Sequence, residues 1–249
     1  MKIAVTGKGG CGKTMLAGAL SCHLADRGHH VVAVDADPNP NLGVALGLPA
    51  VDVEDMDSIL TGLQASGHTH HDPTPEPDEL VARFGLRAPG GVDLVATGKI
   101  EAPNDSCLCC GSHATTRRFF GDLPAQQRVV VADLEAGLND LIWAQPGADD
   151  VVVVVADRSA KAVDVAARAA HVAAQMGVQR IVAVANRSHG DGDAQQLGEA
   201  TGVPAMAIPE DSTIGLADRQ GVAAFDTDAE SPAMAAIAEL ADTLVGAGV

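Results

Sequence analysis

Six short and almost unbroken apolar runs limit the possible folds of this chain more than any other feature. They occupy residues 2–6, 31–35, 92–97, 129–133, 151–157 and 180–186. Apolar and polar residues do not alternate within them, so both faces of each strand should be buried, as in a parallel sheet covered by helices. Helical patterns lie between the runs, among them 14–28, 162–177 and 231–248. The sequence therefore predicts an α/β fold, a doubly wound and mostly parallel sheet flanked by helices.

The length of the chain fits a single domain over residues 1–249. With 47% hydrophobic residues, the chain can bury one sizeable core but is short for two. A His-, Pro- and acid-rich stretch without apolar periodicity predicts an exposed insertion around residues 62–90. The sequence SCLCC, in a context of Gly, Pro, Asn and Asp, predicts a cysteine-bearing loop around residues 103–113.

Charge and cysteine content argue against several classes of protein. The formal net charge is -17 and the sixteen basic residues are scattered, which argues against a nucleic-acid partner. No apolar run reaches the length of a membrane span and no charged leader precedes a long apolar stretch, so we expect a cytoplasmic protein without a membrane partner. Three of the five cysteines fall within four residues, which suits metal or redox chemistry better than a disulfide framework.

The segment GKGGCGKT, residues 7–14, follows the first apolar run and opens the first predicted helix. In that context the pattern GxxxxGK[ST] predicts a phosphate-binding loop. Backbone N–H groups surround the phosphates, Lys13 balances their charge, and the Thr14 hydroxyl is a candidate Mg²⁺ ligand. The residues expected to contact the nucleotide here are Gly7, Gly9, Gly10, Cys11, Gly12, Lys13, Thr14 and Met15.

Lys8, an additional lysine in this loop, points to a known family. The pattern KGGxGKT resembles the deviant Walker A loop of the MinD, ParA and nitrogenase iron protein superfamily of P-loop ATPases, and the resemblance extends over nearly the whole chain. It implies a nucleotide-sandwich homodimer in which Lys8 reaches the phosphates bound by the other subunit. The alternative is an exposed loop lysine near the phosphates of a monomer.

Two further segments resemble the switch regions of this family. VDADPNPNLG resembles switch I, which implies that Asp37, next to Asp35, orients the attacking water or supports Mg²⁺. VVVADLEAG resembles Walker B and switch II, which implies that Asp133 holds the Mg²⁺ hydration shell and that Gly137 gives the loop freedom to move. A lone Asp after a strand is otherwise a cap or turn residue. The catalytic residues implied by the resemblance are Lys8, Lys13, Asp37 and Asp133.

The base-binding segments of the family also have counterparts. The resemblance implies that Asn186 and Arg187, at a strand end, and Pro209 and Glu210, in a loop over residues 207–221, lie near the base. It also implies ATP and ADP as the nucleotides. Met15 replaces the second hydroxyl residue of the family loop, so one hydrogen bond to the α-phosphate is missing. Cys11 replaces an aliphatic residue; a thiol at a helix N-terminus has a lowered pKa or a packing role, and we favour packing.

The cysteine cluster consists of Cys107, Cys109 and Cys110. In extended backbone, residues two apart point the same way, so Cys107 and Cys109 should converge while Cys110 points elsewhere. A two-fold homodimer would then supply four thiolates to one ion. The CxC pair and DLEAGL resemble the CooC-type ATPases that mature nickel carbon monoxide dehydrogenase, which implies Ni or Zn and a client metalloenzyme. Alternatives are a [4Fe–4S] cluster between subunits and buried, inert thiols.

Histidines offer further candidate ligands. His68, His70, His71 and Asp72 lie in the predicted insertion, where a solvated or transient metal-collecting loop is expected rather than a defined centre. His113 lies close to the cysteines and is a further candidate. The leading hypothesis is a metallochaperone ATPase with slow turnover in the absence of its partner. The rival hypotheses are a positioning ATPase of the MinD or ParA kind and an ATP-driven Fe–S reductase.

Overall fold

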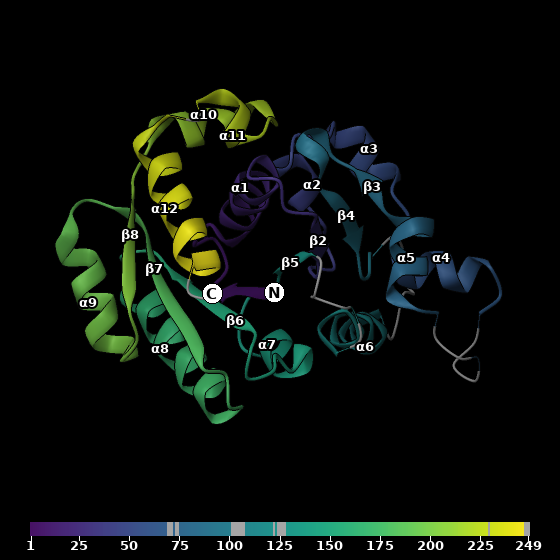
Figure 1. Ribbon diagram of the computed structural model, residues 1–249, viewed down its shortest axis with the longest axis horizontal. Helices are drawn as coiled ribbons and strands as arrows, with labels where there is room; N and C mark the ends of the chain where they lie inside the picture. The colour runs from purple at the N-terminus through teal and green to yellow at the C-terminus, as the bar shows by residue number, and fades with distance from the viewer. Residues whose placement is uncertain are drawn as a thin grey trace.

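The structure is a computed structural model that describes residues 1–68, 72, 75–100, 108–121, 123, 128–228 and 230–246, with the backbone alone at 108–112 and 191. Figure 1 shows one sheet with helices on both faces. The strand order is β3-β4-β2-β5-β1-β6-β7-β8, and only β3 and β4 pair antiparallel. The strands are β1 (Lys2–Gly7), β2 (Val31–Asp35), β3 (Leu86–Arg87), β4 (Asp93–Ala96), β5 (Val129–Asp133), β6 (Val151–Ala156), β7 (Arg180–Ser188) and β8 (Ala205–Pro209). The prediction of a single-domain α/β fold is confirmed.

Alternate residues of the central strands enter two separate cores. Ile3 and Val5 pack on one side of the sheet, and Ala4 packs on the other, all fully buried. This arrangement explains why the strands are apolar throughout: each has a helical layer on both faces. The helices are α1 (Lys13–Asp26), α2 (Leu42–Ala45), α3 (Ala50–Asp55), α4 (Ile59–Ala65), α5 (Pro77–Phe84), the 3-10 helix η1 (Pro89–Gly91), α6 (Leu108–Gly121), α7 (Asn139–Ala144), α8 (Ala160–Gln175), α9 (Asp191–Thr201), α10 (Ser212–Gln220), α11 (Ala224–Thr227) and α12 (Pro232–Gly246).

The two helical layers differ in what they carry. The core on the α1 side includes residues of α12, whereas the opposite core includes Phe119 of α6, Leu141 of α7 and residues of α8. Figure 1 shows α1 and α12 on one side of the sheet and α6, α7 and α8 on the other. Helix α6, which begins at Leu108 within the cysteine cluster, therefore lies on the layer opposite the helix that follows the phosphate-binding loop.

Parts of the predicted irregular segments are regular structure. Within the predicted insertion at 62–90, α5 buries Leu80 and β3 pairs with β4 at the edge of the sheet. The prediction of an exposed insertion is therefore wrong for these elements, because Pro77 and Leu80, three positions apart, form one buried face of α5. The predicted loop at 207–221 contains the end of β8 and the whole of α10. Short strands ending at proline, such as β8, give little sequence periodicity.

The topology of the sheet indicates where a ligand can bind. In the strand order, β2 lies on one side of β1, and β6, which follows later in the chain, lies next to β1 on its other side. In open α/β sheets, ligands bind beyond the carboxyl ends of the strands at such a switch point. The predicted phosphate-binding loop joins β1 to α1 at this position, next to the ends of β5 and β6.

Candidate nucleotide site

Two glycines allow the loop between β1 and α1 to pass close to neighbouring strands. Gly12 has φ +95°, and a Cβ added there would lie 2.2 Å from the Nδ2 atom of Asn186. A Cβ added at Gly7, with φ +152°, would lie 2.2 Å from the carbonyl oxygen of Val155. Any larger residue at either position would have to displace the neighbouring strand or its side chain. Both glycines are therefore required by the path of the loop.

Thr14 and Asp133 form the polar centre of the site. The Thr14 hydroxyl donates a hydrogen bond of 2.6 Å to Oδ2 of Asp133, at the end of β5. Oδ1 of Asp133 is buried and has no hydrogen-bond partner among the described residues. Burial raises the pKa of Asp133 to about 6, although the Thr14 hydrogen bond and the charge of Lys13 oppose the shift. A buried carboxylate with a free oxygen beside a hydroxyl fits an Mg²⁺ ion, which prefers oxygen ligands and retains several waters.

Asp35 is a second buried carboxyl at this edge. It ends β2 directly opposite Asp133 in the strand register. Burial, and then the charge of Asp133, raise the pKa of Asp35 to about 8. Its Oδ2 accepts backbone N–H bonds from Asn41 at 2.9 Å and Leu42 at 2.8 Å. Asp35 therefore anchors the segment after β2, while Asp37, half-buried in that segment, accepts only the local N–H of Asn39 among the bonds described.

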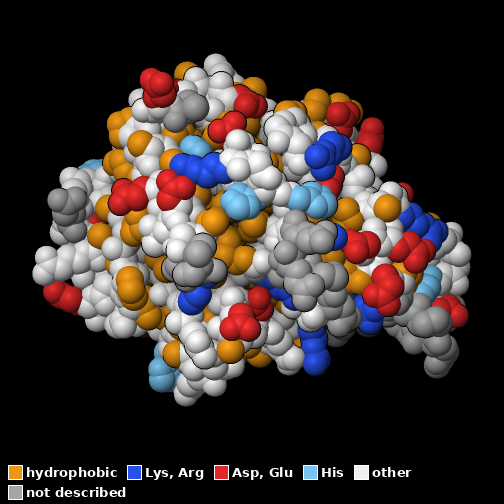
Figure 2. Space-filling model, viewed as in Figure 1, with side chains coloured by type: hydrophobic (Ala, Val, Ile, Leu, Met, Phe, Trp, Pro, Cys, Tyr) orange, Lys and Arg blue, Asp and Glu red, His pale blue; other side chains and the backbone are white. Residues whose placement is uncertain are grey.

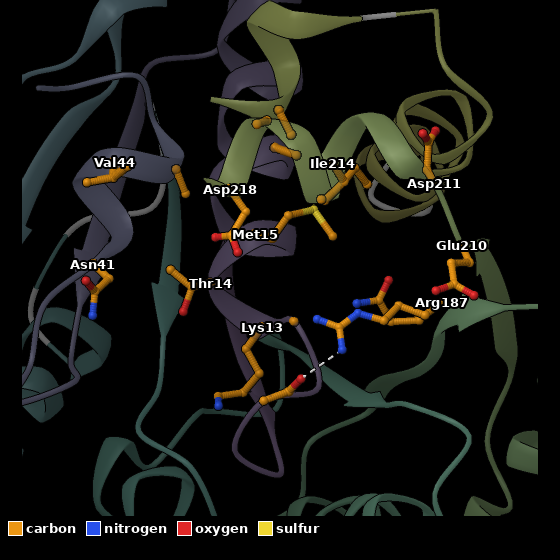
Figure 3. A pocket seen from close by; sticks show the side chains of 18 of the residues that line it. Lys13, Thr14, Met15, Asn41, Val44, Arg187, Glu210, Asp211, Ile214 and Asp218 are labelled. Carbon is orange, nitrogen blue, oxygen red and sulfur yellow. Dashed lines mark hydrogen bonds between the residues drawn. The ribbon is translucent and has the colours of Figure 1, made fainter. Parts of the chain in front are cut away.

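A cavity of about 620 Å³ begins at Lys13 and Thr14 and extends past the ends of β7 and β8. Figure 3 shows Lys13 and Thr14 at one end, Arg187 in the middle, and Glu210 and Asp211 at the far end. The volume is within the range typical of small-molecule sites. The predicted contact residues that line the cavity are Gly10, Gly12, Lys13, Thr14, Met15, Asn186, Arg187, Pro209 and Glu210.

The remaining predicted residues lie nearby but do not line the cavity. Among them, Gly7 ends β1 and Gly9 is exposed in the loop. Cys11 is fully buried, its thiol donates to the carbonyl of Val155 at 3.3 Å, and burial raises its pKa. This burial fits the packing role favoured for Cys11. The half-buried Lys8 has its ammonium near the carbonyl of Gly9, at 3.4 Å.

An irregularity in β7 positions the predicted base contacts. The pairing of β7 with β8 shifts register between Asn186 and Ser188, and Arg187 between them has φ +55°. Such a bulge aims side chains that a regular strand would place elsewhere. Nη1 of Arg187 donates to the carbonyl of Gly10 at 3.3 Å, the dashed line in Figure 3, and the buried Asn186 amide donates to the carbonyl of Cys11 at 2.8 Å. Both side chains thus brace the phosphate-binding loop from the side of the cavity.

The structure changes the interpretation of the cysteine cluster. Cys107 lies outside the described residues, and Cys109 and Cys110 belong to the first turn of α6. The predicted loop over 103–113 is therefore wrong from residue 108 onward. The extended geometry assumed for Cys109 is wrong as well, because a helix does not return side chains to one face every second residue. His70 and His71 also lie outside the described residues.

Several residues of the site were not singled out from the sequence. Asn41 and Val44 line the cavity near Thr14, and Ile214 and Asp218 of α10 line it near Met15. Asn41 lies within the segment that resembles switch I and was within reach of motif reasoning. The positions of Ile214 and Asp218 depend on how α10 packs, and no spacing rule indicates them.

A second polar group lies beside the first, at the corner between α6 and α7. Nε2 of His113, on α6, is 2.6 Å from Oδ1 of the buried Asp140, on α7. Oδ2 of Asp140 accepts the backbone N–H of Glu135 at 3.0 Å. Burial raises the pKa of both Asp140 and Glu135. Neither carboxylate was predicted to be functional, because they come from a loop and a helix with no shared motif.

Comparison with known proteins agrees with this geometry. The family model described as the CobQ/CobB/MinD/ParA nucleotide binding domain matches residues 2–222. The chain belongs to this family. It is therefore a nucleotide-binding P-loop ATPase, with ATP or ADP and Mg²⁺ as its cofactors. Lys13, Thr14 and Asp133 are the described residues whose positions fit these cofactors.

Two relatives show how far the similarity extends. The chain is 31% identical over 238 residues to the carbon monoxide dehydrogenase accessory protein CooC of Rhodospirillum rubrum, covering 91% of this chain and 90% of that protein. It is 29% identical over 193 residues to an ATP-binding protein of Methanocaldococcus jannaschii, covering 75% of each. The CooC similarity thus includes nearly the whole length of both chains.

Solved structures share the fold. The cell division ATPase MinD of Pyrococcus furiosus superimposes with a TM-score of 0.76 at 23% identity, covering 99% of both chains. The septum site-determining protein MinD of Pyrococcus horikoshii, complexed with Mg-ADP, gives a TM-score of 0.75 at 20% identity, covering 99% of this chain and 97% of that one. These similarities establish the P-loop architecture of the domain.

The surface carries mixed charges on the face that Figure 2 shows. Lys and Arg side chains are scattered there among Asp and Glu side chains. A scattered distribution creates no continuous positive field of the kind that attracts a phosphate backbone. Among the described residues, no helix has both the length and the apolar composition needed to cross a bilayer.

Proposed function

We propose that this ATPase is a metallochaperone that binds Ni²⁺ or Zn²⁺ through cysteines and delivers the ion to a client metalloenzyme such as carbon monoxide dehydrogenase. The observation that carries the proposal is the similarity to CooC over nine-tenths of the chain, together with three cysteines within four residues. Thiolates are soft ligands suited to these ions, and one chain with a CxC pair supplies half of a tetrahedral set.

The proposal requires a homodimer closed by nucleotide. Lys8 would reach the phosphates bound by the partner subunit, since among the described residues its ammonium bonds only the carbonyl of the adjacent Gly9. Closing the two copies would bring Cys107 and Cys109 of each chain to the two-fold axis. Cys110 is the cysteine least suited to this pairing, because it falls outside the CxC spacing.

The nucleotide site supports a division of tasks in hydrolysis. Lys13 would balance the charge of the β- and γ-phosphates, Asp37 would orient the attacking water, and Asn186, Arg187, Pro209 and Glu210 would surround the base. Thr14 and Asp133 would hold Mg²⁺, Asp133 through water. Bound Mg²⁺ would neutralise charge on the transferred phosphoryl group.

Helix α6 offers a physical route from nucleotide to metal. Its first turn contains Cys109 and Cys110, and the same helix packs against α7, which follows the loop after Asp133. His113 joins the two helices through its contact with Asp140. A change in the loop after Asp133 would therefore move α7 and, through it, the first turn of α6 that contains the cysteines. Such a movement is how a switch alters the affinity of a protein for its metal cargo.

The test is the metal content of the protein with ATP bound. Wild type, Cys107→Ala/Cys109→Ala and the control Cys110→Ser are loaded with Ni²⁺, desalted and analysed for nickel, with molar mass from light scattering. The proposal predicts a dimer in which the double variant holds about half a nickel ion per chain less than wild type, because two chains share one four-thiolate site. Cys110→Ser should retain the wild-type amount. Equal nickel in wild type and the double variant would overturn the proposal.

A further inference from the structure

A group of three potential metal ligands lies at the α6–α7 corner. His113, Glu135 and Asp140 each offer one atom, and these atoms lie within 4.8 Å of one another. Zn²⁺ binds nitrogen and oxygen ligands at about 2.0–2.1 Å, so two tetrahedral ligands of one ion lie roughly 3.3 Å apart. Small side-chain rotations are therefore enough to bring the three atoms around one ion. We propose that His113, Glu135 and Asp140 bind a divalent transition-metal ion, such as Ni²⁺ or Zn²⁺, at a site separate from the cysteines.

The state of Asp140 is the observation that points to a ligand. Its side chain is 2% exposed, and its Oδ2 is occupied by the N–H of Glu135. Its Oδ1 lies 2.6 Å from Nε2 of His113, yet the contact lacks hydrogen-bond geometry and Oδ1 has no hydrogen-bond partner among the described residues. A buried carboxylate oxygen without a donor is costly. A cation among the three side chains would give Oδ1 the partner that it lacks.

The imidazole of His113 is held by a neighbouring aromatic ring. The rings of His113 and Trp143 stack, with centroids 5.5 Å apart and planes 9° from parallel. Stacking fixes the ring while Nε2 faces the two carboxylates, and only 15% of the His113 side chain is exposed. A ring fixed in this way needs little reorganisation to bind an ion through Nε2. Glu135 is half-buried and leaves the site open to solvent on one side.

The donor set determines which ion fits. One imidazole nitrogen and two carboxylate oxygens suit Zn²⁺ and Ni²⁺, whereas Mg²⁺ favours oxygen ligands alone. Glu135 follows Asp133, the residue proposed to hold Mg²⁺ through water, by two positions, and His113 follows Cys109 by four positions in α6. The site is thus close in sequence to both a proposed Mg²⁺ ligand and a cysteine. It rests on these three residues and does not require the cysteines to bind metal.

The only tryptophan of the chain provides the readout. Trp143 stacks on His113 and the sequence contains no tyrosine, so intrinsic fluorescence reports on this corner. The full chain carrying Cys107→Ala/Cys109→Ala/Cys110→Ala, free of nucleotide and with Mg²⁺ present, is titrated with Ni²⁺ and then Zn²⁺. Equilibrium dialysis gives the stoichiometry. We expect a saturable change in fluorescence at one ion per chain.

Matched variants in the same background assign the site. His113→Gln and, separately, Glu135→Gln should weaken binding by roughly tenfold or more, the loss expected for removing even a supporting contact of a ligand. The control His171→Gln, at an exposed position of α8, should bind as the parent does. Thermal unfolding confirms that each variant is folded. Absence of saturable binding in the parent, or unchanged affinity in both His113→Gln and Glu135→Gln, would overturn the inference.

The experiment separates this inference from the proposed function. Binding to the cysteine-free chain supports the new site whatever the wild-type cysteines do. Loss of half an ion per chain on removing Cys107 and Cys109 supports the shared cysteine site whatever the α6–α7 corner does. The α6–α7 site and the shared cysteine site can therefore be accepted or rejected independently of each other.

Discussion

The phosphate-binding edge of the sheet and the α6–α7 corner hold their polar groups in different ways. At the edge, glycines at Gly7 and Gly12 and the ends of parallel strands fix the backbone, and Thr14 satisfies one oxygen of Asp133. At the corner, side chains from two helices and a loop meet, and the contact between His113 and Asp140 joins them. Each region leaves one buried carboxylate oxygen, Oδ1 of Asp133 or Oδ1 of Asp140, without a hydrogen-bond partner among the described residues. The phosphate-binding edge is rigid because the backbone forms it, and it suits a single kind of ligand. The α6–α7 corner is formed by side chains, which can bind or release an ion by small rotations.

The largest expected effect is a loss of ATP hydrolysis that leaves metal binding at the α6–α7 corner largely intact. Lys13→Ala should reduce ATP hydrolysis about a hundredfold or more, because it removes the charge that balances the phosphates. Metal binding by the cysteine-free chain should change much less, by about fivefold at most, since Lys13 is not a ligand and acts on Glu135 only through its charge. Phosphate release and the Trp143 titration measure the two effects. The control is Lys161→Ala, at an exposed position of α8; equal losses in both assays would contradict the separation.

The next prediction tests the rigidity of the phosphate-binding edge. Gly12→Ala and Gly10→Ala both place Cβ on a residue with positive φ, which costs about 1–2 kcal/mol. Only Gly12→Ala also collides with the Asn186 amide, which should add about 1–3 kcal/mol. Urea unfolding without nucleotide measures the difference. Equal free energies of unfolding for the two variants would show that the loop is not braced by Asn186.

The buried carboxyls predict how stability depends on pH. The pKa values of Asp133, about 6, and Asp35, about 8, exceed their unfolded values, so the folded state binds more protons than the unfolded state between pH 4 and 8. The nucleotide-free protein should therefore lose stability as the pH rises from 5 to 8.5. Mg²⁺ with a non-hydrolysable ATP analogue should make the free energy of unfolding fall less steeply with pH, because the bound ion favours the ionised carboxylates. A rise in the free energy of unfolding over that range would contradict the account.

The smallest effect concerns Met15, which lines the cavity in the position of a family hydroxyl residue. Met15→Thr should tighten ADP binding by roughly fivefold, the equivalent of one hydrogen bond of about 1 kcal/mol. Isothermal titration calorimetry gives the dissociation constant, and Met15→Val is the control that removes the thioether without adding a hydroxyl. Tightening by valine alone would assign the effect to packing.

The same contrast explains what the sequence could predict. The positions of six of the strands along the chain, the phosphate-binding loop and Asp133 follow from local patterns, because each depends on residues close together in the chain. The paired carboxyls Asp35 and Asp133 follow from strand register, and the contact between His113 and Asp140 follows from the packing of α6 on α7. Neither of these two contacts can be predicted from the spacing of residues in the sequence. Helix α6 was predicted as a loop at its start because turn-forming residues precede the cysteines.

The central claim is that nucleotide controls metal affinity, and the most direct test is the dissociation constant of Ni²⁺ for the wild-type chain in two nucleotide states. Competition with a chromophoric chelator gives this constant with Mg²⁺ and a non-hydrolysable ATP analogue, and again with ADP. We expect at least about a tenfold difference, within the usual range of coupling between sites. Identical affinities in the two states would show that hydrolysis and metal binding are independent, and would contradict the account.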